Sequence, residues 1–318
     1  MKNWQEYILE ASRDQTALLR KWQDLRYGDG TIVNVDEQGI VRQFIPSCLG
    51  VEFHEKMETG TTLRALQYKH LHLAYWETPY YCAAIESALQ NVNIADEIIL
   101  DLGCGDGRFT ELLIKLGARR IVATDCNLSS LASLAAFAEE KGFADCLLLI
   151  HSGADTLKVR FEAFGIIIAM GVLYYLNEHY ESGLSHAVAL LKKGGHFIAS
   201  EPDFEGAAFK ALIFEGLEDY IDLFEQGYFS EIDAGETFKF RAFTKEEIQN
   251  KYRENGLEVL NSYCLSLLPS LLRIGMVRGH YTQAHIAKFE SRIRESFDYF
   301  NKYGQLPKHI IWHCRKGW

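Results

Sequence analysis

A turn with glycine at alternate positions lies between a strand-like and a helix-like segment, and it constrains the fold more than any other feature. Residues 98–102 form a short apolar run typical of a buried strand. The segment after the turn has an apolar helix face at Phe109, Leu112, Leu113 and Leu116. The turn itself reads Gly103-Cys104-Gly105-Asp106-Gly107. Because glycine lets the chain turn tightly and lets a ligand approach without meeting a Cβ, the pattern predicts a ligand-binding turn.

The alternation of strands and helices continues beyond this turn. Strand-like runs lie at 121–124, 146–150, 164–170, 196–200, 257–265 and 309–315. Helical periodicity lies between them, for example at 185–193, where Gly194-Gly195 is expected to end the helix. Strand–helix alternation on this scale requires a parallel sheet with helices on both faces, and right-handed crossovers make that sheet doubly wound. We therefore predict an α/β fold with a doubly wound, mostly parallel sheet.

Three segments fall outside the alternation and indicate how the chain is organised. Residues 1–95 are predicted to form an N-terminal extension or cap, with a helix and a β-hairpin around 31–44. Residues 96–318 form the main domain, and insertions at about 206–240 and 266–304 interrupt it. Additions to such folds usually cover the carboxyl end of the sheet, where ligands bind, so we expect both insertions to be helical lids.

The net charge and the cysteines bound the partners of the protein. The chain has 33 basic and 43 acidic side chains and a formal net charge of −10. Proteins that bind phosphate backbones usually have the opposite balance, so nucleic acid is not expected as a partner. The 7 cysteines include no CxxC pair, which indicates reduced thiols and no metal site. His70 and His72 lack a third ligand at recognisable spacing.

The sequence contains no pattern typical of a membrane span or a secretion signal. The longest apolar run, 164–176, is shorter than the roughly 20 residues that a bilayer requires. Residues 1–15 alternate charged and apolar side chains and lack the apolar core of a signal peptide. We therefore expect a cytoplasmic protein without membrane association.

An acidic residue ends the second strand and indicates the class of ligand. Asp125 lies 18 residues after Gly107, at a place where a carboxylate faces the same crevice and can accept hydrogen bonds from both ribose hydroxyls. The glycine spacing is GxGxG, not the GxGxxG of dinucleotide sites, which argues against a nicotinamide dehydrogenase. Asp101 and Asp106 flank the turn, and two carboxylates repel a pyrophosphate but suit an ammonium group. A ribose, a positive charge and no phosphate describe S-adenosylmethionine.

Residues 101–107 resemble motif I of the class I S-adenosylmethionine-dependent methyltransferases, and Asp125 matches their ribose-binding acid. The similarity extends through 170–176 and 194–202, so that it covers roughly residues 95–202. It implies a Rossmann-like, seven-stranded sheet whose last strand is antiparallel. It also implies S-adenosylmethionine as the cofactor and S-adenosylhomocysteine as its product.

The resemblance implies a cofactor site made from the turns that follow successive strands. Its implied members are Asp101, Gly103, Cys104, Gly105, Gly107, Asp125, Cys126, Ala154, Asp155 and Met170. Asp101 is expected near the amino group of the cofactor, and Cys126 on the adenine face. Family members commonly place Asp-Ala after the third strand, where this chain has Ser152-Gly153-Ala154-Asp155. We expect either Asp155 or the backbone of Ala154 to contact the adenine.

Methyl transfer is an in-line displacement that depends mainly on proximity and orientation and needs no covalent enzyme nucleophile. A base is required only if the acceptor must lose a proton. Tyr174, after the fourth strand, and Glu201, at the end of the fifth, are the catalytic candidates. Tyr174 could position an acceptor or only pack against it, and Glu201 could orient an acceptor, act as a base or be structural. His179 and His196 are interpreted as structural.

The two lids leave the charge of the acceptor open. Residues 211–238 contain eight acidic side chains and no Lys or Arg, which suits an amine. The second insertion has basic side chains that suit an acidic substrate. The extensive cover favours a small-molecule acceptor in biosynthesis, methylated on oxygen or nitrogen. An RNA or protein methyltransferase and a catalytically silent cofactor-binding partner are the alternatives, and the sequence leaves the oligomeric state open.

Overall fold

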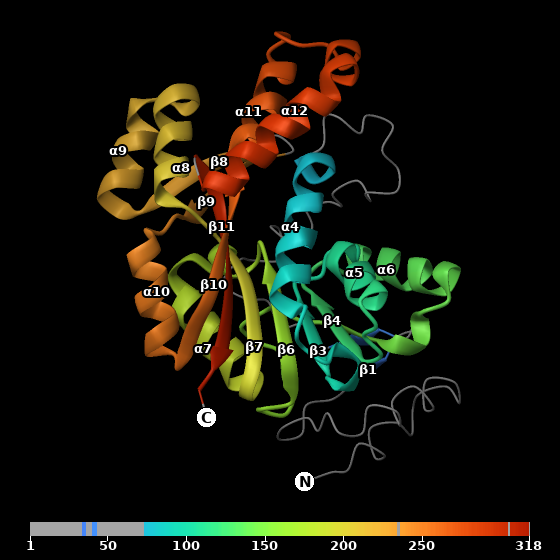
Figure 1. The fold of residues 1–318 in the computed structure, drawn as a ribbon. Coiled ribbons are helices and arrows are strands. Elements are labelled where there is room, and N and C mark those ends of the chain that lie inside the picture. The colour runs from blue at the N-terminus through green and yellow to red at the C-terminus, as the bar shows by residue number, and fades with distance from the viewer. Residues whose placement is uncertain (1–33, 36–39, 43–72, 234–235, 305, 318) are drawn as a thin grey trace.

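One large sheet organises the chain, as Figure 1 shows. The computed structural model describes residues 34–35, 40–42, 73–233, 236–304 and 306–317. Within these ranges the strands of this sheet have the order β1-β2-β5-β4-β3-β6-β7-β11-β10. Their bounds are β1 (Asn34–Val35), β2 (Val41–Arg42), β3 (Ile99–Leu102), β4 (Ile121–Asp125), β5 (Leu147–His151), β6 (Phe164–Met170), β7 (Leu191–Pro202), β10 (Leu257–Ser266) and β11 (Pro307–Lys316).

The seven strands from β5 to β10 confirm the predicted doubly wound, mostly parallel sheet. Strands β5, β4, β3, β6 and β7 are parallel to one another. Strand β11 runs antiparallel to both β7 and β10. The central strands read as continuous apolar runs because both faces are covered, which is typical of parallel sheets. β1 and β2 extend the sheet at the β5 edge, and residues 36–39 of the expected hairpin turn lie outside the described residues.

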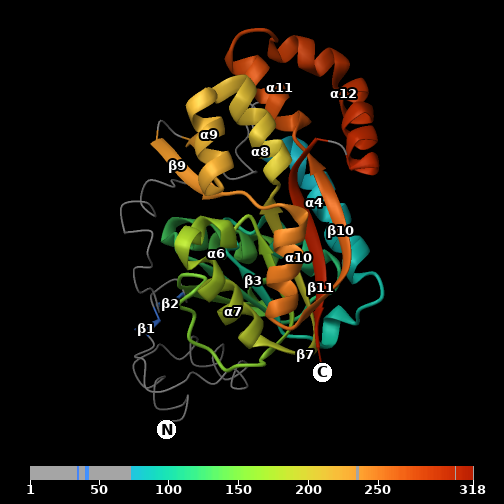
Figure 2. The ribbon, with the colours of Figure 1, turned by 90° about the vertical axis from the view of Figure 1, so that its left-hand side faces the viewer.

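Helices cover both faces of the sheet. The longer ones are α4 (Leu73–Leu89), α5 (Arg108–Lys115), α6 (Leu128–Lys141), α7 (Tyr180–Leu190) and α10 (Lys245–Glu254). Short 3₁₀ turns are η2 (Ile94–Asp96), η3 (Ala144–Cys146) and η4 (Leu173–His179). Helices α4, α5 and α6 lie on one face, and Figure 2 shows α7 and α10 on the other. Separate apolar cores fill the two sides, one around Phe109 and Leu131 and the other around Leu184 and Tyr252.

The boundary between α7 and β7 differs from the expected one. The sequence predicts a helix over 185–193 that ends at Gly194-Gly195, whereas α7 ends at Leu190 and β7 runs through both glycines. Pairing with β6 decides this, since Phe164 pairs with Leu191 and, after a register shift, Ile166 pairs with His196. A Cβ on Gly195 would lie 3.0 Å from the Gly165 carbonyl oxygen, so the irregularity requires a residue without a side chain.

The two insertions lie beyond the carboxyl ends of the parallel strands (Figure 1). The first consists of α8 (Phe204–Lys210), η5 (Ala211–Glu215), α9 (Leu217–Gln226), β8 (Tyr228–Asp233) and β9 (Glu236–Arg241). The second consists of α11 (Leu268–Val277) and α12 (Gln283–Tyr303). The first insertion is helical over residues 204–226, as expected, and continues into the antiparallel pair of β8 and β9. The second insertion packs on α4, whose Trp76 contacts Met276 and Phe297 in a small apolar cluster.

The described residues were expected to contain neither a membrane span nor a metal site. None of the helices found there is both long and apolar enough to cross a bilayer. That part of the chain also contains no group of three or more His, Cys, Asp or Glu side chains arranged to hold a metal ion. His70 and His72 lie outside the described residues.

Two histidines on neighbouring strands make the stability of the fold depend on pH. His196 Nδ1 lies 2.9 Å from His313 Nε2, and the rings stack with centroids 5.2 Å apart. Burial lowers both pKa values, and it lowers the pKa of His313 from 6.5 to about 4. The folded state therefore prefers neutral imidazoles, whereas the unfolded chain becomes protonated first as the pH falls.

We expect the free energy of unfolding to decrease as the pH falls from about 6.5 to about 4, and His313→Phe to remove part of this decrease. Urea unfolding of both proteins at several pH values measures the difference between them. His285→Phe, on exposed helix α12, is the matched control. A difference between wild type and His313→Phe that is the same at neutral and acidic pH would contradict this account.

Candidate functional site

The glycine turn between β3 and α5 is open on one side. Gly103, Gly105 and Gly107 all have positive φ, at 68°, 55° and 90°. A Cβ on Gly103 would lie 2.4 Å from Val172 Cγ2, and one on Gly107 would lie 2.3 Å from Leu134 Cδ1. At Gly105 no heavy atom lies within 4 Å of that position. The outer glycines therefore let the turn pack closely, and the central one leaves space where a ligand can meet the backbone.

Asp125 at the end of β4 is hydrogen-bonded to the turn. Its Oδ2 accepts from the Gly105 amide at 2.8 Å, and its Oδ1 accepts from the Asn127 amide at 2.7 Å. Burial raises the pKa of this carboxyl, and the two backbone donors oppose the rise because they stabilise the ionised form. Asp125 is partly buried, and its two hydrogen bonds hold the carboxylate beside Gly105.

The turn after β5 places a buried acceptor near Asp125. The Ser152 amide donates to the Asp125 carbonyl oxygen at 3.1 Å, which joins the two loops. Asp155 Oδ1 is buried and has no hydrogen-bond partner among the described residues. The charges of Asp125 and Asp155 both raise the pKa of Cys126, so these side chains are neighbours. A buried carboxylate oxygen without a donor is costly, which makes this atom fit a ligand amino group.

Two residues of the predicted cofactor set lie beneath the turn rather than on its open side. Asp101 is 1% exposed, and its Oδ2 accepts from Thr110 Oγ1 at 2.5 Å. Burial raises the pKa of Asp101 to about 6. The Cys104 side chain is buried, and its amide donates to the Thr124 carbonyl oxygen at 2.8 Å. Both residues therefore support the turn from inside, and a contact between Asp101 and an amino group stays a prediction.

Tyr174 lies in an aromatic cluster at the carboxyl end of the sheet. Its ring stacks on Tyr175 with centroids 4.6 Å apart and meets the edge of His309 at 5.5 Å. Its hydroxyl lies 3.6 Å from the position of a Cβ on Gly171, directly after β6. Val172, two residues before Tyr174, is the residue that packs against Gly103 of the glycine turn. Met170 ends β6 at the same place and is buried.

Sequence reasoning did not assign His309 on β11 to the site and did not predict that it meets Tyr81 on α4. Tyr81 Oη lies 3.3 Å from His309 Nδ1. Burial, followed by the charge of Glu77, raises the pKa of Tyr81 to about 12, so its phenol is neutral near pH 7. Arg108, the first residue of α5, lies 5.2 Å from the centroid of the Tyr81 ring. Tyr81 and His309 are far apart in the sequence. For His309, the sequence indicated only that it lies in an expected strand.

A buried ion pair adjoins the same cluster. Lys308 Nζ donates to Glu77 Oε1 at 2.9 Å, and both side chains are largely buried. Glu77 therefore lies at the carboxyl end of the sheet. Trp76 is instead fully buried against the second insertion. The pair fixes α4 to the beginning of β11, which holds Tyr81 against His309.

Glu201 is in the core, which corrects the expectation that it faces an acceptor. It is 1% exposed, and its Oε1 accepts from Tyr180 at 3.0 Å and from Tyr252 at 3.3 Å. Side chains alternate along a strand, so Ser200 faces the α4 side while Glu201 faces α7 and α10. Glu201 Oε2 is buried without a partner in the described part of the chain, and burial raises the pKa of this carboxyl to about 8.

A cationic contact joins the two insertions. The Arg278 guanidinium, just after α11, lies 5.4 Å from the centroid of the Phe214 ring. Its Nη2 donates to the Phe214 carbonyl oxygen at 3.3 Å. Glu218 and Asp222 of the first insertion are exposed on α9. The acidic first insertion and the basic second insertion therefore adjoin each other above the sheet.

The sheet order and the open glycine turn define the class I S-adenosylmethionine-dependent methyltransferase fold. Residues 99–195, less than a third of this chain, match the family model described as a methyltransferase domain. Two solved structures with similar folds are a putative S-adenosylmethionine-dependent methyltransferase from Listeria monocytogenes and the 1,6-didemethyltoxoflavin-N1-methyltransferase of Burkholderia thailandensis. The first has 14% identity, a TM-score of 0.54 and coverage of 76% of this chain and 99% of that chain. The second has 14% identity, a TM-score of 0.50 and coverage of 92% and 95%.

A curated relative has a different kind of acceptor in its name. The tRNA U34 carboxymethyltransferase of Methylococcus capsulatus is 28% identical over 146 residues, which is 45% of this chain and 43% of that protein. This chain therefore matches less than half the length of that relative. The comparisons do not support the expectation that excluded nucleic acid as a partner, because the relative is named for a tRNA substrate.

The burial of Glu201 predicts that the free energy of unfolding decreases as the pH rises from about 4.5 to about 8. The folded state holds the proton up to about pH 8, whereas the unfolded chain releases it near 4.5. Stability is therefore lost as the pH rises through this window, by up to about 1.4 kcal/mol per pH unit for one proton. Glu201→Gln keeps an acceptor for both tyrosines and has no proton to lose.

We expect Glu201→Gln to gain stability relative to wild type as the pH rises from about 5 to about 8. Urea unfolding at both pH values measures the gain, and exposed Glu254→Gln is the control. Parallel pH profiles for wild type and Glu201→Gln would show that Glu201 is ionised in the folded protein.

Proposed function

We propose that this chain transfers a methyl group from S-adenosylmethionine to an acceptor held beneath the two lids. The observation that supports this most directly is the open space at Gly105, bordered by Asp125 and by the unpartnered oxygen of Asp155. The donor set is acidic and suits a cofactor with a ribose, an amino group and a positive charge. When bound, S-adenosylmethionine would supply an electrophilic methyl carbon attached to a sulfonium.

In this proposal the residues of three adjacent loops bind the cofactor. The carboxylate of Asp125 would accept the ribose hydroxyls, and Asp155 Oδ1 would accept the adenine amino group. Asp155 thus replaces the acid expected at Gly153, two positions earlier. Cys126 would pack on the adenine, while Ala154 and Met170 would line the site beside it. A solved structure of similar fold contains S-adenosylhomocysteine, which is consistent with this assignment.

We infer that the acceptor binds at the cluster of Tyr174, Tyr81 and His309. The Tyr174 hydroxyl lies near Gly171, the Tyr174 ring contacts His309, and His309 lies 3.3 Å from the Tyr81 hydroxyl. Tyr174 would hold the acceptor in line with the methyl carbon, and the lids would exclude water. His309, hydrogen-bonded to Tyr81, is the group best placed to handle a proton from an oxygen or nitrogen acceptor. The enclosure favours a small molecule.

An RNA acceptor is the second candidate, and two observations favour it. The relative in Methylococcus capsulatus is named for a tRNA substrate. In addition, the second insertion has a surplus of positive charge, with six Lys or Arg and three Asp or Glu over residues 268–304. Charge of this sign attracts a phosphate backbone, and such binding weakens as the salt concentration rises.

Cofactor binding is tested by titrating S-adenosylhomocysteine into variants of the two acids. Asp125→Asn removes the charge at the ribose, and we expect the affinity to fall about tenfold to a hundredfold. Asp155→Ala removes the acceptor for the adenine amino group, and we expect a loss of about tenfold. Glu139→Gln, exposed on α6, is the control. Failure of the wild-type protein to bind S-adenosylhomocysteine would overturn the proposal.

Methyl transfer is tested with isotope-labelled S-adenosylmethionine and two fractions of a cell extract, one of small metabolites and one of RNA. We expect the label in a small metabolite, and we expect Tyr174→Phe to slow transfer about tenfold while S-adenosylhomocysteine still binds. Label in the RNA fraction would favour the second candidate. No label in these two fractions or in a protein fraction of the same extract, with cofactor binding intact, would identify a catalytically silent cofactor-binding protein.

A further inference from the structure

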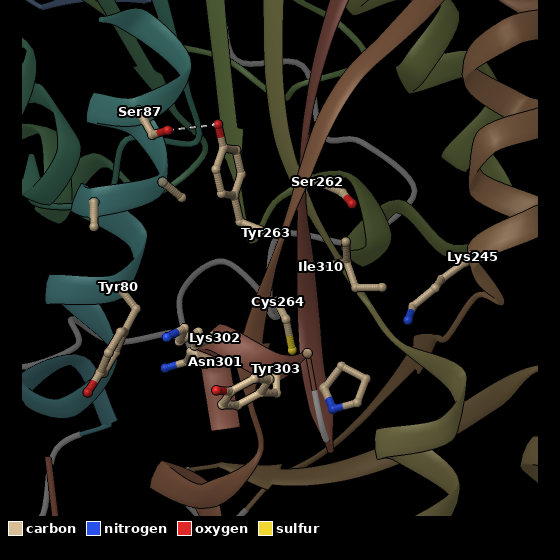
Figure 3. Close-up of a pocket in the computed structure, with 14 residues that line it drawn as sticks. Tyr80, Ser87, Lys245, Ser262, Tyr263, Cys264, Asn301, Lys302, Tyr303 and Ile310 are labelled. Atoms are coloured by element: carbon tan, nitrogen blue, oxygen red, sulfur yellow. Dashed lines mark hydrogen bonds between the residues drawn. The ribbon is translucent and has the colours of Figure 1, made fainter. Parts of the chain in front are cut away.

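A pocket between α4, β10 and the end of α12 contains none of the residues assigned above to methyl transfer. Its volume is about 620 Å³, which is within the range of small-molecule sites. Figure 3 shows its walls, which come from α4, α10, β10, α12 and β11. None of the described side chains that line it is a carboxylate, although two are lysines. In a chain with a net charge of −10, such a pocket selects for anions.

The two lysines have their charges available. Neither Lys245 nor Lys302 forms an ion pair within the part of the chain that the structure describes. Burial raises the pKa of Asp203, and Lys245 lies close enough for its charge to oppose this rise, but Asp203 accepts its hydrogen bond from the Glu205 amide at 3.0 Å. Asp298 accepts the Tyr80 hydroxyl at 2.9 Å. No salt bridge to either lysine is formed by these two acids in the described part of the chain.

A buried amide adds a directed hydrogen-bond donor. Asn301 Oδ1 accepts from the Ser266 amide at 2.6 Å, which fixes the orientation of the side chain. Asn301 Nδ2 is buried and has no partner among the described residues. In Figure 3 the side chains of Asn301 and Lys302 both extend toward Tyr80. A buried donor without an acceptor is costly, and an anionic oxygen at this place would satisfy it beside the Lys302 ammonium.

Aromatic rings and apolar side chains form the rest of the pocket. Lys302 Nζ lies 5.4 Å from the centroid of the Tyr303 ring, and Tyr303 packs against Tyr299 with centroids 4.7 Å apart. The hydroxyl of Tyr263 donates to Ser87 Oγ at 3.1 Å, so that ring is fixed across the pocket. Tyrosine faces and the neighbouring apolar wall suit a flat ring that stacks or packs edge to face.

We propose that this pocket binds an aromatic phosphate monoester. The phosphate lies at Lys302 and Asn301, the ring packs among the tyrosines, and Lys245 adds attraction from the side of Ile310. A phosphate monoester has a charge of about −1.5 to −2 near pH 7, which matches two ammonium groups better than a carboxylate does. The ligand is either a free nucleotide or the phosphorylated 5′ end of an RNA chain, since both present a phosphate monoester next to a base.

Calorimetry of the full chain with phenyl phosphate tests the proposal. We expect phenyl phosphate to bind at least about tenfold more tightly than inorganic phosphate, because only the former fills the aromatic part. Lys302→Ala and Lys245→Ala should each weaken binding about fivefold or more. Lys288→Ala, which replaces an exposed lysine of α12 outside the pocket, should leave it unchanged. No binding of phenyl phosphate, or equal affinity in both pocket variants and wild type, would overturn the proposal.

Two further titrations distinguish the sources of the ligand. If uridine monophosphate binds at least as tightly as a ten-residue oligouridylate with a 5′-phosphate, the result supports a free nucleotide as the ligand. An oligouridylate that binds far more tightly and with a steep salt dependence supports an RNA chain, provided that Lys302→Ala weakens it. The proposal does not depend on methyl transfer. We therefore expect S-adenosylhomocysteine to bind equally well to Lys302→Ala and to wild type. Loss of S-adenosylhomocysteine binding alone would therefore refute only the proposed reaction.

Discussion

The hydrogen bond from the Gly105 amide to the Asp125 carboxylate is the interaction on which the rest of the site depends. It joins the ends of two neighbouring parallel strands, and two further bonds extend the connection. The Cys104 amide donates to the Thr124 carbonyl oxygen, and the Ser152 amide donates to the Asp125 carbonyl oxygen. The loops after β3, β4 and β5 are therefore held as one surface. Because residue 105 is a glycine, no side chain projects from that surface there, and no heavy atom lies within 4 Å of its Cβ position.

The acceptor side is assembled differently, from elements that are distant in the chain. Tyr81 comes from α4, Tyr174 from the turn after β6, and His309 from β11. The ion pair between Glu77 and Lys308 fixes α4 against β11, so the phenol and the imidazole meet. The residues proposed for the cofactor side therefore come from one compact motif and its neighbouring loops, whereas those proposed for the acceptor side come from elements that are distant in the sequence. Methyl transfer depends mainly on the alignment of the reacting atoms.

Two acidic residues at strand ends have different environments in this fold. Asp125 faces the crevice, whereas Glu201 points to the opposite face and receives hydrogen bonds from Tyr180 and Tyr252. The difference follows from the alternation of side chains along a strand, where a shift of one residue exchanges the two faces. A carboxylate at the carboxyl end of a parallel strand is therefore a functional candidate only when its register places it on the crevice side.

The sequence alone determined the doubly wound sheet, the open glycine turn and the position of Asp125, because these depend on short-range periodicity and on residues close together in the chain. Tertiary structure decided the rest. Strand pairing with β6 extended β7 through Gly194 and Gly195, although the local pattern predicted a helix end there. Packing between distant segments brought His309 to Tyr81 and placed Glu201 among tyrosines. Contacts of this kind depend on how whole elements pack, and local sequence patterns contain no information about that packing.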